Sequence, residues 1–579
     1  RSVSRGLGDV YKRQLFEWYP SPQIIFEFYL DGLSGVMMIL ISGLSLVIQL
    51  FSTSYMSKDE KYTKYFEYFN FFVFSMLLLV LSGNFLVMFF GWELVGLSSY
   101  LLISFWYEKK SAAKAGNKAF ILNRIGDFGF LIGLMMILNY FETFNFVNIF
   151  ESVLIKQPSN LDLIILFLLL GAFGKSAQFP LFSWLPDAME GPTPASALIH
   201  AATMVTAGVF MLVRVSPMLQ FSELASLTII GFGLLTALIA AFAAINQDDI
   251  KKVLAYSTIS QLGFMFIAIG AGAYVAAICP LVTHAFCTAL FLLGAGAVIH
   301  EMHHEQNIHK MGGLRKKMPI TAAMMGIGTL AISGIPPLAG FWSKDEILAS
   351  VFSKGGIYYG FWALSLLAAF MTAFYMGRHW LLIFVKEPKN SLENIHEAPK
   401  NMTRPLILLG ISTIFIGFIN TPFFHGLEKV LEETLHHVEV THLPKGLTLA
   451  VLAVLSIGAG FTGLVLAYLI YIFDIISYFK LKIPFINEIK NLSKNVIFIN
   501  DIGNIVFVKG LKSVSRRVAV TVDAMTIDGI VNGISKYFLK SSKQLSYTQT
   551  GLVRNYVVYF GLFTLILVLI FLISPEVLA

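Results

Sequence analysis

Long apolar runs separated by short polar segments make up most of this 579-residue chain. Most of these runs reach the roughly 18 residues that an α-helix needs to cross a bilayer. The pattern therefore predicts an all-α polytopic membrane protein with fourteen crossings. The crossings are expected at 32–52, 66–82, 84–107, 117–141, 161–180, 194–214, 225–246, 252–272, 276–299, 317–353, 357–385, 404–424, 447–476 and 552–574.

Two of these spans are interrupted by prolines and also carry a lysine. Lys175 lies shortly before Pro180, and Lys344 follows the adjacent prolines Pro336 and Pro337. A break at membrane depth frees backbone carbonyls and amides, which are tolerated only around a cavity or a binding site. Because the two broken spans lie five crossings apart, we expect two five-helix repeats in inverted orientation, with one lysine in each. The repeats are predicted at 66–214 and 225–385.

The segments outside the repeats differ in character. Residues 1–14 are basic and contain glycine, and we interpret them as a non-native segment. Residues 15–31 combine aromatic residues with prolines, which is typical of a hairpin outside the membrane. A first helix and its loop are expected at 32–65, further membrane helices at 404–476, and a last transmembrane helix at 552–574.

The stretch 480–545 is too polar to span a membrane, yet its second half repeats apolar residues at helical spacing. Cations occupy the opposite face, so the pattern predicts an amphipathic lateral helix along the cytoplasmic interface. About forty helical residues would reach roughly 60 Å, which suits a helix that braces a neighbouring protein. A disordered connector is the alternative interpretation. The apolar positions are Leu511, Val514, Val518, Val522, Met525, Ile534 and Phe538, and the cations are Lys509, Lys512, Arg516 and Arg517.

Composition and charge agree with a membrane protein. The chain is 56% hydrophobic and only 13% charged, whereas soluble domains carry about 25% charged residues. The net charge of +7 is explained by membrane orientation, so no nucleic-acid partner is expected. Loops after odd-numbered crossings hold thirteen lysines and arginines against two after even-numbered crossings, which places the odd loops in the cytoplasm and residues 15–31 outside. The thirteen are Lys58, Lys61, Lys64, Lys109, Lys110, Lys114, Lys118, Lys251, Lys252, Lys310, Arg315, Lys316 and Lys317, and the two are Lys156 and Arg214.

No motif in the chain indicates a bound cofactor or metal. Cys279 and Cys287 lie in one apolar span and form neither a metal pattern nor a disulfide framework. No GxGxxG motif follows a predicted strand and no GxxxxGK(S/T) motif is found, so the chain shows no nucleotide or flavin fold of its own. Four histidines near one membrane rim have metal-like spacing but no cysteine beside them, and we expect no metal site there. They are His300, His303, His304 and His309. We interpret the HHVEVTH segment at 436–442 as solvated loop.

Charged side chains at membrane depth are candidate functional groups, because each costs several kcal/mol to bury there. Glu93 is a lone carboxylate in its span, and Lys175 is the cation expected to pair with it. Such a pair can pass a proton, or it can hold two helices in register as a static ion pair. Asp127 is either a second buried acid or the partner of Arg124, three residues earlier on the same helix face. We favour the pairing with Arg124.

Further titratable residues lie along the later spans. His200 can relay a proton or satisfy a backbone carbonyl, and the residues alone leave both readings open. Lys251 and Lys252 stand at the cytoplasmic end of a predicted helix, where they are either anchors that reach toward the interface or proton relays, and we favour the anchors. His284 and Lys344 are the remaining titratable candidates at membrane depth.

Several long motifs resemble one known family. The motifs are GWELVGLSSYLL, GKSAQFPLFSWLPDAMEGPTPASALIHAATMVTAG, DIKKVLAYSTISQLG, HHEQNIHKMGGLRK and FWSKDEIL. They are similar to segments of subunit L of bacterial NADH–quinone oxidoreductase (respiratory complex I), whose mitochondrial counterpart is chain 5. The resemblance runs from about residue 15 to the C-terminus. It implies an antiporter-like fold with two inverted five-helix repeats, a broken helix in each, and a long lateral helix before the last crossing.

The resemblance also implies roles for individual residues. Glu93 matches the glutamate that pairs with Lys175, and Asp127 matches an acidic residue beside that pair. His200 matches the relay histidine. The remaining matches are Lys251 in the DIK motif, His284 at the start of a relay motif, and Lys344 as the lysine of the second half-channel.

The chain departs from the family pattern in three ways. Thr288 stands where the family has a lysine of the central relay, and threonine cannot carry that charge. Pro280 occupies a position where relatives often have histidine. These two departures bear on the connection between the half-channels. The family also has two more N-terminal helices, which is consistent with a truncation behind residues 1–14.

Together the residues and the resemblance predict a proton-translocating membrane subunit of NADH–quinone oxidoreductase, an enzyme complex in which this chain holds no redox centre. NADH, FMN, iron–sulfur clusters and quinone are expected in partner subunits. The expected partners are the other membrane subunits of complex I, especially antiporter-like neighbours along the lateral helix, and the expected location is the bacterial inner membrane.

Other functions remain open at this point. One alternative is a subunit of a multisubunit sodium/proton antiporter, which shares the broken-helix core. A membrane hydrogenase subunit and a partner in bicarbonate uptake are more distant possibilities. The alternative of a different class is a passive membrane scaffold whose charges form static pairs only.

Overall fold

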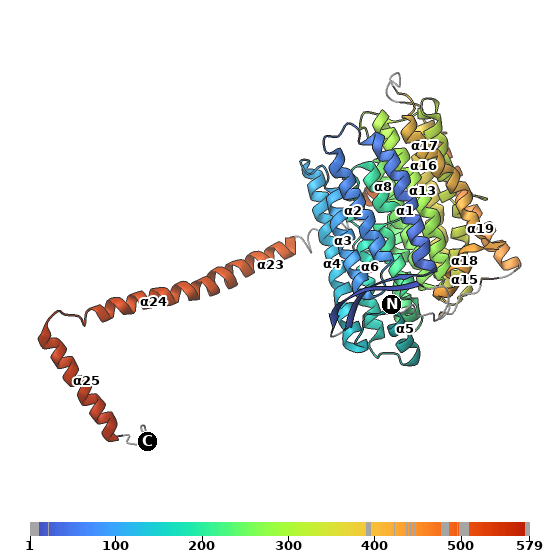
Figure 1. Cartoon of the computed structure of the whole chain (residues 1–579). Coiled ribbons are helices and arrows are strands. Elements are labelled where there is room, and N and C mark those ends of the chain that lie inside the picture. The colour runs from blue at the N-terminus through green and yellow to red at the C-terminus, as the bar shows by residue number, and fades with distance from the viewer. Residues whose placement is uncertain are drawn as a thin grey trace. The chain divides into compact units, whose positions relative to one another are not determined.

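The computed structural model describes residues 11–20, 23–388, 395–421, 423–435, 438, 443–444, 446–475, 486–494, 496 and 509–573. The chain divides into two compact units, Arg1–Ile497 and Phe498–Ala579. In the first unit the long helices lie side by side as a bundle, and a strand hairpin crosses one end of that bundle (Figure 1).

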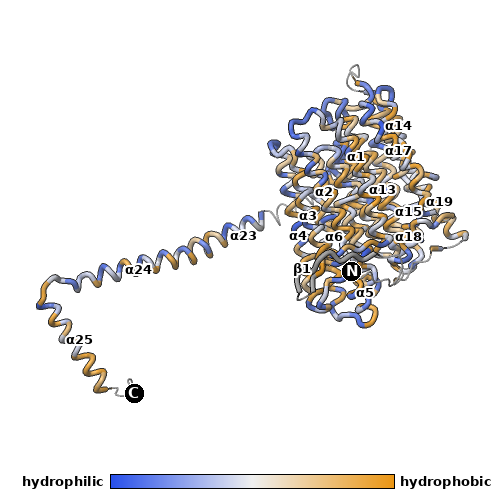
Figure 2. Tube along the Cα trace, in the orientation of Figure 1, coloured by the Kyte–Doolittle hydropathy of each residue, from blue (hydrophilic) through white to orange (hydrophobic). Residues whose placement is uncertain are grey.

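The helices of the first unit follow the predicted apolar runs. Most of the hydrophobic residues lie along these helices (Figure 2). In the first predicted repeat and before it they are α1 Gly32–Tyr55, α2 Tyr62–Val80, α3 Phe85–Ile103, α4 Lys110–Phe141, α5 Phe146–Ile155, α6 Leu161–Lys175, α7 Trp184–Asp187, α8 Thr193–Ala201, α9 Ala207–Arg214 and α10 Ser216–Leu219. The later helices are α11 Glu223–Ile245, α12 Ile250–Gly270, α13 Tyr274–Glu301, α14 Pro319–Ile332, α15 Ala339–Ser353, α16 Tyr358–Trp380, α17 Lys400–Phe415, α18 Gly426–Leu435, α19 Leu447–Tyr471 and α21 Ile486–Lys494.

The chain is a multi-pass membrane protein. Within the described residues, twelve helices are long and apolar enough to cross a membrane. Eleven of the twelve coincide with predicted crossings, and the twelfth, Lys512–Ser546, is the predicted lateral helix. The other three predicted crossings are 66–82, which contains most of α2, and the two broken spans, 161–180 with α6 and 317–353 with α14 and α15.

The predicted hairpin is formed by β1 Tyr11–Pro20 and β2 Gln23–Leu30, which pair antiparallel. Its first strand begins inside the segment 1–14 that we interpret as non-native, because Tyr11 pairs with Leu30. Residues 1–10 lie outside the described part of the chain, so that interpretation stays a prediction. A second, shorter strand pair, β3 Asn420–Thr421 with β4 Phe424–His425, precedes α18.

A buried ion pair ties the hairpin to the helix bundle. Asp31 caps α1 by accepting a hydrogen bond from the backbone amide of Ser34, at 3.0 Å. The same carboxylate accepts two bonds from the guanidinium of Arg214 at the end of α9, at 2.5 and 2.9 Å. The bidentate geometry is the arrangement that gives arginine–carboxylate pairs their directionality. It therefore fixes the start of α1 against the end of the first predicted repeat.

The two broken spans interrupt their helices in similar ways. The helix α6 ends at Lys175, shortly before Pro180, and α14 ends at Ile332 before Pro336. Proline has no amide hydrogen and cannot continue the helical hydrogen-bond ladder. In the second span Gly334 also adopts φ +76°, a conformation that glycine tolerates best. In each predicted repeat the broken span is the fourth crossing, as the inverted-repeat prediction requires.

The second unit consists of α23 Gly510–Val518, a π-helical segment Ala519–Ile527, α24 Asp528–Ser546 and α25 Val553–Ile573. No described residue of this unit is buried. Polar and apolar residues alternate along α23 and α24, whereas α25 is mostly apolar (Figure 2). The predicted lateral helix is thus present from residue 510, while 501–508 and the side chain of Leu511 lie outside the described residues. Its position at the membrane interface stays a prediction.

The stretch predicted at 480–545 is not a single element. Its described early part, α21, belongs to the first unit and docks on α11, where the Ser493 hydroxyl donates to the Phe242 carbonyl at 2.6 Å. Helical spacing of apolar residues is found in the sequence only from residue 501 onward. This spacing does not identify α21, because that helix is short and mostly polar. Of the HHVEVTH segment only Val438 lies among the described residues, so its interpretation as solvated loop stays a prediction.

Candidate functional site

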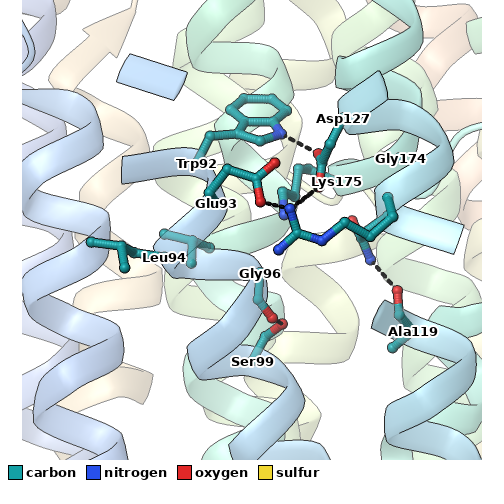
Figure 3. A network of polar contacts seen from close by, with 12 residues as sticks. Trp92, Glu93, Leu94, Gly96, Ser99, Ala119, Asp127, Gly174 and Lys175 are labelled. Carbon is teal, nitrogen blue, oxygen red and sulfur yellow. Dashed lines mark hydrogen bonds and ion pairs between the residues drawn. The ribbon is translucent and has the colours of Figure 1, made fainter. Parts of the chain in front are cut away.

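Lys175 lies at the last position of α6 with its side chain completely buried. Its ammonium is 3.7 Å from a carboxylate oxygen of Asp127 on α4. The same carboxylate accepts a hydrogen bond of 2.7 Å from the indole of Trp92 on α3. Three helices thus bring an acid and a base together at the break in the first repeat (Figure 3).

Glycines create the space in which Lys175 and Asp127 meet. A Cβ at Gly126 would lie 2.9 Å from a carbonyl of α6 and 3.1 Å from the Cα of Gly174, so α4 and α6 approach there through their backbones. A Cβ at Gly96 would lie 2.7 Å from the lysine ammonium itself. Since such distances exclude a larger side chain without a shift, these small residues determine where the charged pair can form.

The predicted pairing of Glu93 with Lys175 is wrong in this structure. Glu93 instead forms an ion pair with Arg124 of α4, and both side chains are partly exposed, at 21% and 38%. Arg124 also lies 3.9 Å from Asp127, so the favoured Arg124–Asp127 pairing exists but is longer than the contact of Asp127 with Lys175. The physical reason is that consecutive residues on a helix point about 100° apart. Trp92 therefore reaches Asp127, whereas its neighbour Glu93 reaches Arg124, one turn earlier on α4.

Arg124 is the group whose importance the sequence reasoning underestimated. It contacts both carboxylates of the site, and its spacing of three residues from Asp127 was the available signal. The sequence left two roles open for Asp127, a second buried acid or a partner of Arg124, and in the structure Asp127 has both. Its Oδ2 atom and the Lys175 ammonium form no hydrogen bond with any described residue. The pair is therefore in ionic contact without being locked by directional bonds.

His200 lies in the last turn of α8, where the helix is interrupted. Thr203 interrupts it by donating its hydroxyl to the carbonyl of Leu198 at 2.5 Å. The imidazole is completely buried, and neither ring nitrogen has a hydrogen-bond partner among the described residues. Its ring centroid lies 6.3 Å from that of Trp184 in α7. Of the two readings left open, the described contacts therefore do not support a bond to a backbone carbonyl.

Lys251 is buried rather than extended toward the interface, so its interpretation as an anchor is wrong. Its backbone amide is capped by Asp249, and its ammonium donates to the carbonyl of Gly191 at 2.9 Å. That carbonyl lies just before α8, which carries His200. The two groups thus belong to one buried region.

The second half contains the other predicted lysine. Lys344 in α15 is buried, and its ammonium donates a hydrogen bond to the Ile332 carbonyl at 2.6 Å. Ile332 is the last residue of α14, so the break leaves its carbonyl without a partner in the helix. His284 in α13 is also buried, and its ring nitrogens lie 2.9 and 3.2 Å from the Thr288 hydroxyl. Thr288 therefore contacts His284 directly, one turn further along α13.

Just before the start of α12, a group of charged residues surrounds Asp248. Its carboxylate lies 2.6 Å from the Lys494 ammonium of α21, 3.1 Å from the His309 ring and 3.9 Å from the Arg378 guanidinium. Burial alone would raise the pKa of Asp248, but the bond and charge of Lys494, with His309 and Arg378, hold it below its ordinary value. One member of the histidine group thus takes part in an ion-pair cluster.

Fold and buried charges together define a membrane protein with an antiporter-like fold. Residues 82–372 match the family described as NADH:quinone oxidoreductase/Mrp antiporter, TM. Residues 18–66 match the N-terminus of complex I chain 5, and 374–512 match a family of C-terminal membrane segments of complex I. The chain belongs to the family of NADH–quinone oxidoreductase subunit L and its organellar counterpart, subunit 5.

Individual relatives cover nearly the whole chain. The chain is 40% identical over 560 residues to NADH-quinone oxidoreductase subunit L of Mycobacterium tuberculosis, covering 95% of this chain and 87% of the relative. It is 40% identical over 586 residues to subunit L of Rickettsia bellii, covering 96% and 89%. It is also 40% identical over 586 residues to the chloroplastic NAD(P)H-quinone oxidoreductase subunit 5 of Mesostigma viride, covering 96% and 87%.

A solved structure supports the fold. The Mrp complex from Dietzia sp. DQ12-45-1b aligns with a TM-score of 0.72 at 26% identity, and the alignment covers 90% of this chain. This chain spans 58% of the matched Mrp chain. The shared fold is the antiporter-like architecture that the broken spans predict.

Proposed function

We propose that this chain translocates protons as a membrane subunit of NADH–quinone oxidoreductase. The observation that carries the proposal is the buried contact between Lys175 and Asp127, with Arg124 on the other side of the same carboxylate. A base and an acid buried together at a helix break are costly to maintain for stability alone. The 40% identity to relatives named as subunits of this enzyme favours this complex over other antiporter-like assemblies.

The proton movement that we propose starts with a choice of partner for Asp127. Its Oδ2 atom lies 3.7 Å from the Lys175 ammonium and 3.9 Å from the Arg124 guanidinium, so the two cations compete for one oxygen at nearly equal distance. Glu93 holds Arg124 from the other side. When Asp127 turns toward Arg124, the buried ammonium of Lys175 loses its counter-charge and releases its proton, because burial disfavours an unpaired charge. When Asp127 returns, Lys175 binds a proton again.

The released proton would pass into the row of buried groups that follows. His200 accepts it first, since both ring nitrogens lack partners among the described residues. Lys251 comes next, and Lys344 with His284 forms the second half of the route. At the position of the missing family lysine, the Thr288 hydroxyl can donate and accept a hydrogen bond and so passes a proton without holding the charge.

The redox chemistry would take place in other subunits. We propose that NADH, FMN, iron–sulfur clusters and quinone bind to partners, and that this chain contributes to the enzyme as its proton-moving subunit. The proposed partners are the membrane subunits of complex I, with antiporter-like neighbours along the lateral helix. The proposed location is the inner membrane of a bacterium, with the odd-numbered loops in the cytoplasm.

The first experiment is purification of the tagged chain from native membranes in mild detergent. Co-elution of NADH oxidation with an artificial acceptor would support complex I. Co-elution of antiporter subunits without that activity would instead favour the sodium/proton antiporter. The structural similarity to the Mrp complex is the observation behind this alternative.

The second experiment measures pumping in proteoliposomes made with the purified complex in sodium-free buffer. We expect Lys175→Ala to lower the number of protons moved per NADH oxidised, because it removes the base at the helix break. NADH oxidation with an artificial acceptor should remain. The matched control is Lys118→Ala, which removes a partly exposed lysine whose ammonium lies 2.7 Å from Asp187. Wild-type pumping stoichiometry in a fully assembled Lys175→Ala complex would refute the proposal, and lost assembly without a selective pumping defect would indicate a scaffold.

A further inference from the structure

The last residue of α13, Glu301, is an acid in an unfavourable place. Its side chain is only 6% exposed, although it lies at the helix end where the macrodipole is negative. Two histidines compensate for this placement. The Nδ1 atom of His300 lies 3.0 Å from one carboxylate oxygen, and the Nδ1 atom of His396 lies 3.0 Å from the other. A buried carboxylate between two imidazoles is an arrangement in which a proton can pass from one ring through the carboxylate to the other.

His396 connects this carboxylate to the surrounding water. Its ring is 76% exposed. Its Nδ1 atom faces two acceptors, the Glu301 carboxylate at 3.0 Å and the Glu397 carbonyl at 3.1 Å. Because a carbonyl oxygen can only accept a hydrogen bond, Nδ1 carries the proton. The other ring nitrogen, Nε2, is then the atom that can take a proton from water.

The loop that carries His396 is held in place on both sides of it. Ile395 and Ala398 are buried. The Glu397 carboxylate accepts hydrogen bonds from the Ile320 amide at 2.7 Å and the Thr321 hydroxyl at 2.6 Å, at the start of α14. The contact between His396 and Glu301 is therefore supported by the packing of its loop and is not an isolated surface encounter.

On the inner side, hydroxyl groups lead from His300 toward Lys251. The ring of Tyr55, in the last turn of α1, lies 6.2 Å from the His300 ring. The Tyr55 hydroxyl is 3.1 Å from the Thr193 hydroxyl at the start of α8. Two residues earlier, the Gly191 carbonyl binds the Lys251 ammonium at 2.9 Å. Hydroxyls both donate and accept hydrogen bonds, so Tyr55 and Thr193 can pass a proton between them, and this pair lies between His300 and the loop that binds Lys251.

We propose that Glu301, with His300 and His396, is the site at which the chain takes up protons from the aqueous phase and passes them through Tyr55 and Thr193 toward Lys251. The inference rests on the proposed function, since it assigns to that route an entry from the aqueous phase at Lys251. In each step one N–H or O–H bond forms as another breaks. Water gives a proton to Nε2 of His396 and leaves as hydroxide, the Nδ1 proton of His396 passes to Glu301, and Glu301 passes it to Nδ1 of His300. Lys251 binds an arriving proton once it has given its own to the next group of the route.

The deciding variant is Glu301→Gln, measured as proton pumping per NADH in proteoliposomes. In dilute buffer at about pH 8 we expect pumping to fall roughly tenfold, because positioned proton-transfer groups contribute at least that much to proton-transfer rates. At about pH 6, where protons are plentiful, the loss should be much smaller. Concentrated imidazole buffer should restore pumping at the higher pH, because a mobile base can deliver the proton that the fixed site no longer collects.

The matched control is Glu305→Gln, which removes a carboxylate from the same rim that lies 2.9 Å from the Lys310 ammonium. It should pump like wild type at both pH values. His396→Asn is the second variant, because its exposed ring can be removed without disturbing assembly. It should show a smaller, imidazole-sensitive loss. The titratable groups that face the Glu301 site from other elements are Tyr55 of α1 and His396 itself.

Two outcomes would overturn the uptake site. Wild-type pumping by Glu301→Gln in dilute buffer at both pH values would exclude it, and so would a loss that is independent of pH and is not restored by imidazole. If either result is found while Lys175→Ala still pumps fewer protons per NADH, only the uptake site is excluded and the proposed function stands. Wild-type pumping by Lys175→Ala, in contrast, would remove the proposed function itself.

Discussion

Lys175 and Lys344 occupy corresponding places at the breaks of the two halves, yet the protein holds their charges differently. Lys175 faces the Asp127 carboxylate at 3.7 Å without a hydrogen bond. Lys344 donates to the Ile332 carbonyl at 2.6 Å, and no carboxylate oxygen of a described residue lies within 4.0 Å of it. A broken helix can thus support a buried cation either through a movable counter-charge or through a fixed backbone dipole. The first arrangement is suited to switching, and the second to holding a proton until it is passed on.

The strongest way to test this comparison is to neutralise the two acids of the first half separately. We expect Asp127→Asn to lower proton flux roughly tenfold or more, because it removes the counter-charge for which Lys175 and Arg124 compete. Glu93→Gln should have a smaller effect, because Glu93 contacts Arg124 rather than Lys175. Proton uptake in proteoliposomes measures both. A larger defect in Glu93→Gln would show that the pairing expected from the family, and not the pairing in this structure, is the functional one.

The next test compares the stability cost of removing each lysine. Lys175→Met removes the nearer of the two cations beside the buried Asp127 carboxylate. We therefore expect the free energy of unfolding of the complex to fall by about 3 kcal/mol. Lys344→Met removes a buried charge that has no carboxylate partner, so the change should stay within about 1 kcal/mol. Thermal unfolding in detergent, monitored by the fluorescence of a dye that does not react with cysteine, measures the stability of both variants. Equal losses would contradict the distinction between a paired and a carbonyl-bound lysine.

The smallest expected effect concerns Thr288 in the second half. Thr288→Val keeps the shape of the side chain but removes the hydroxyl that contacts His284, and we expect proton flux to fall about threefold, as for the loss of one hydrogen bond. Thr288→Ser retains the hydroxyl and serves as the control. If Thr288→Val pumps like wild type, the threonine is not part of the route. Unchanged flux in Thr288→Lys would show that the absent family lysine does not limit this chain.

The sequence was a good guide to the parts of the molecule that depend on length and on proline. Apolar runs long enough to cross a bilayer located the spans, because the membrane leaves few other structures available. The prolines near Lys175 and before Lys344 located both breaks, because proline cannot continue a helix.

Side-chain partners were harder to predict, because they depend on how helices rotate and pack against each other. Which residue of α4 Trp92 and Glu93 each reach depends on the rotation of α3, which follows from close contacts such as that of Gly96 with Lys175. The position of Lys251 at a helix end suggested an anchor, but the carbonyl of Gly191, sixty residues earlier in the sequence, binds its ammonium in the interior. Neither contact leaves a signal in the local pattern of residues.

The helix Val553–Ile573 has a consequence for how this protein is made in the cell. Its 21 residues are mostly apolar and form a helix long enough to cross a bilayer. Lipid can therefore cover these residues before any partner subunit is present. A newly synthesised copy would then be held in the membrane at its C-terminal end while it waits for assembly.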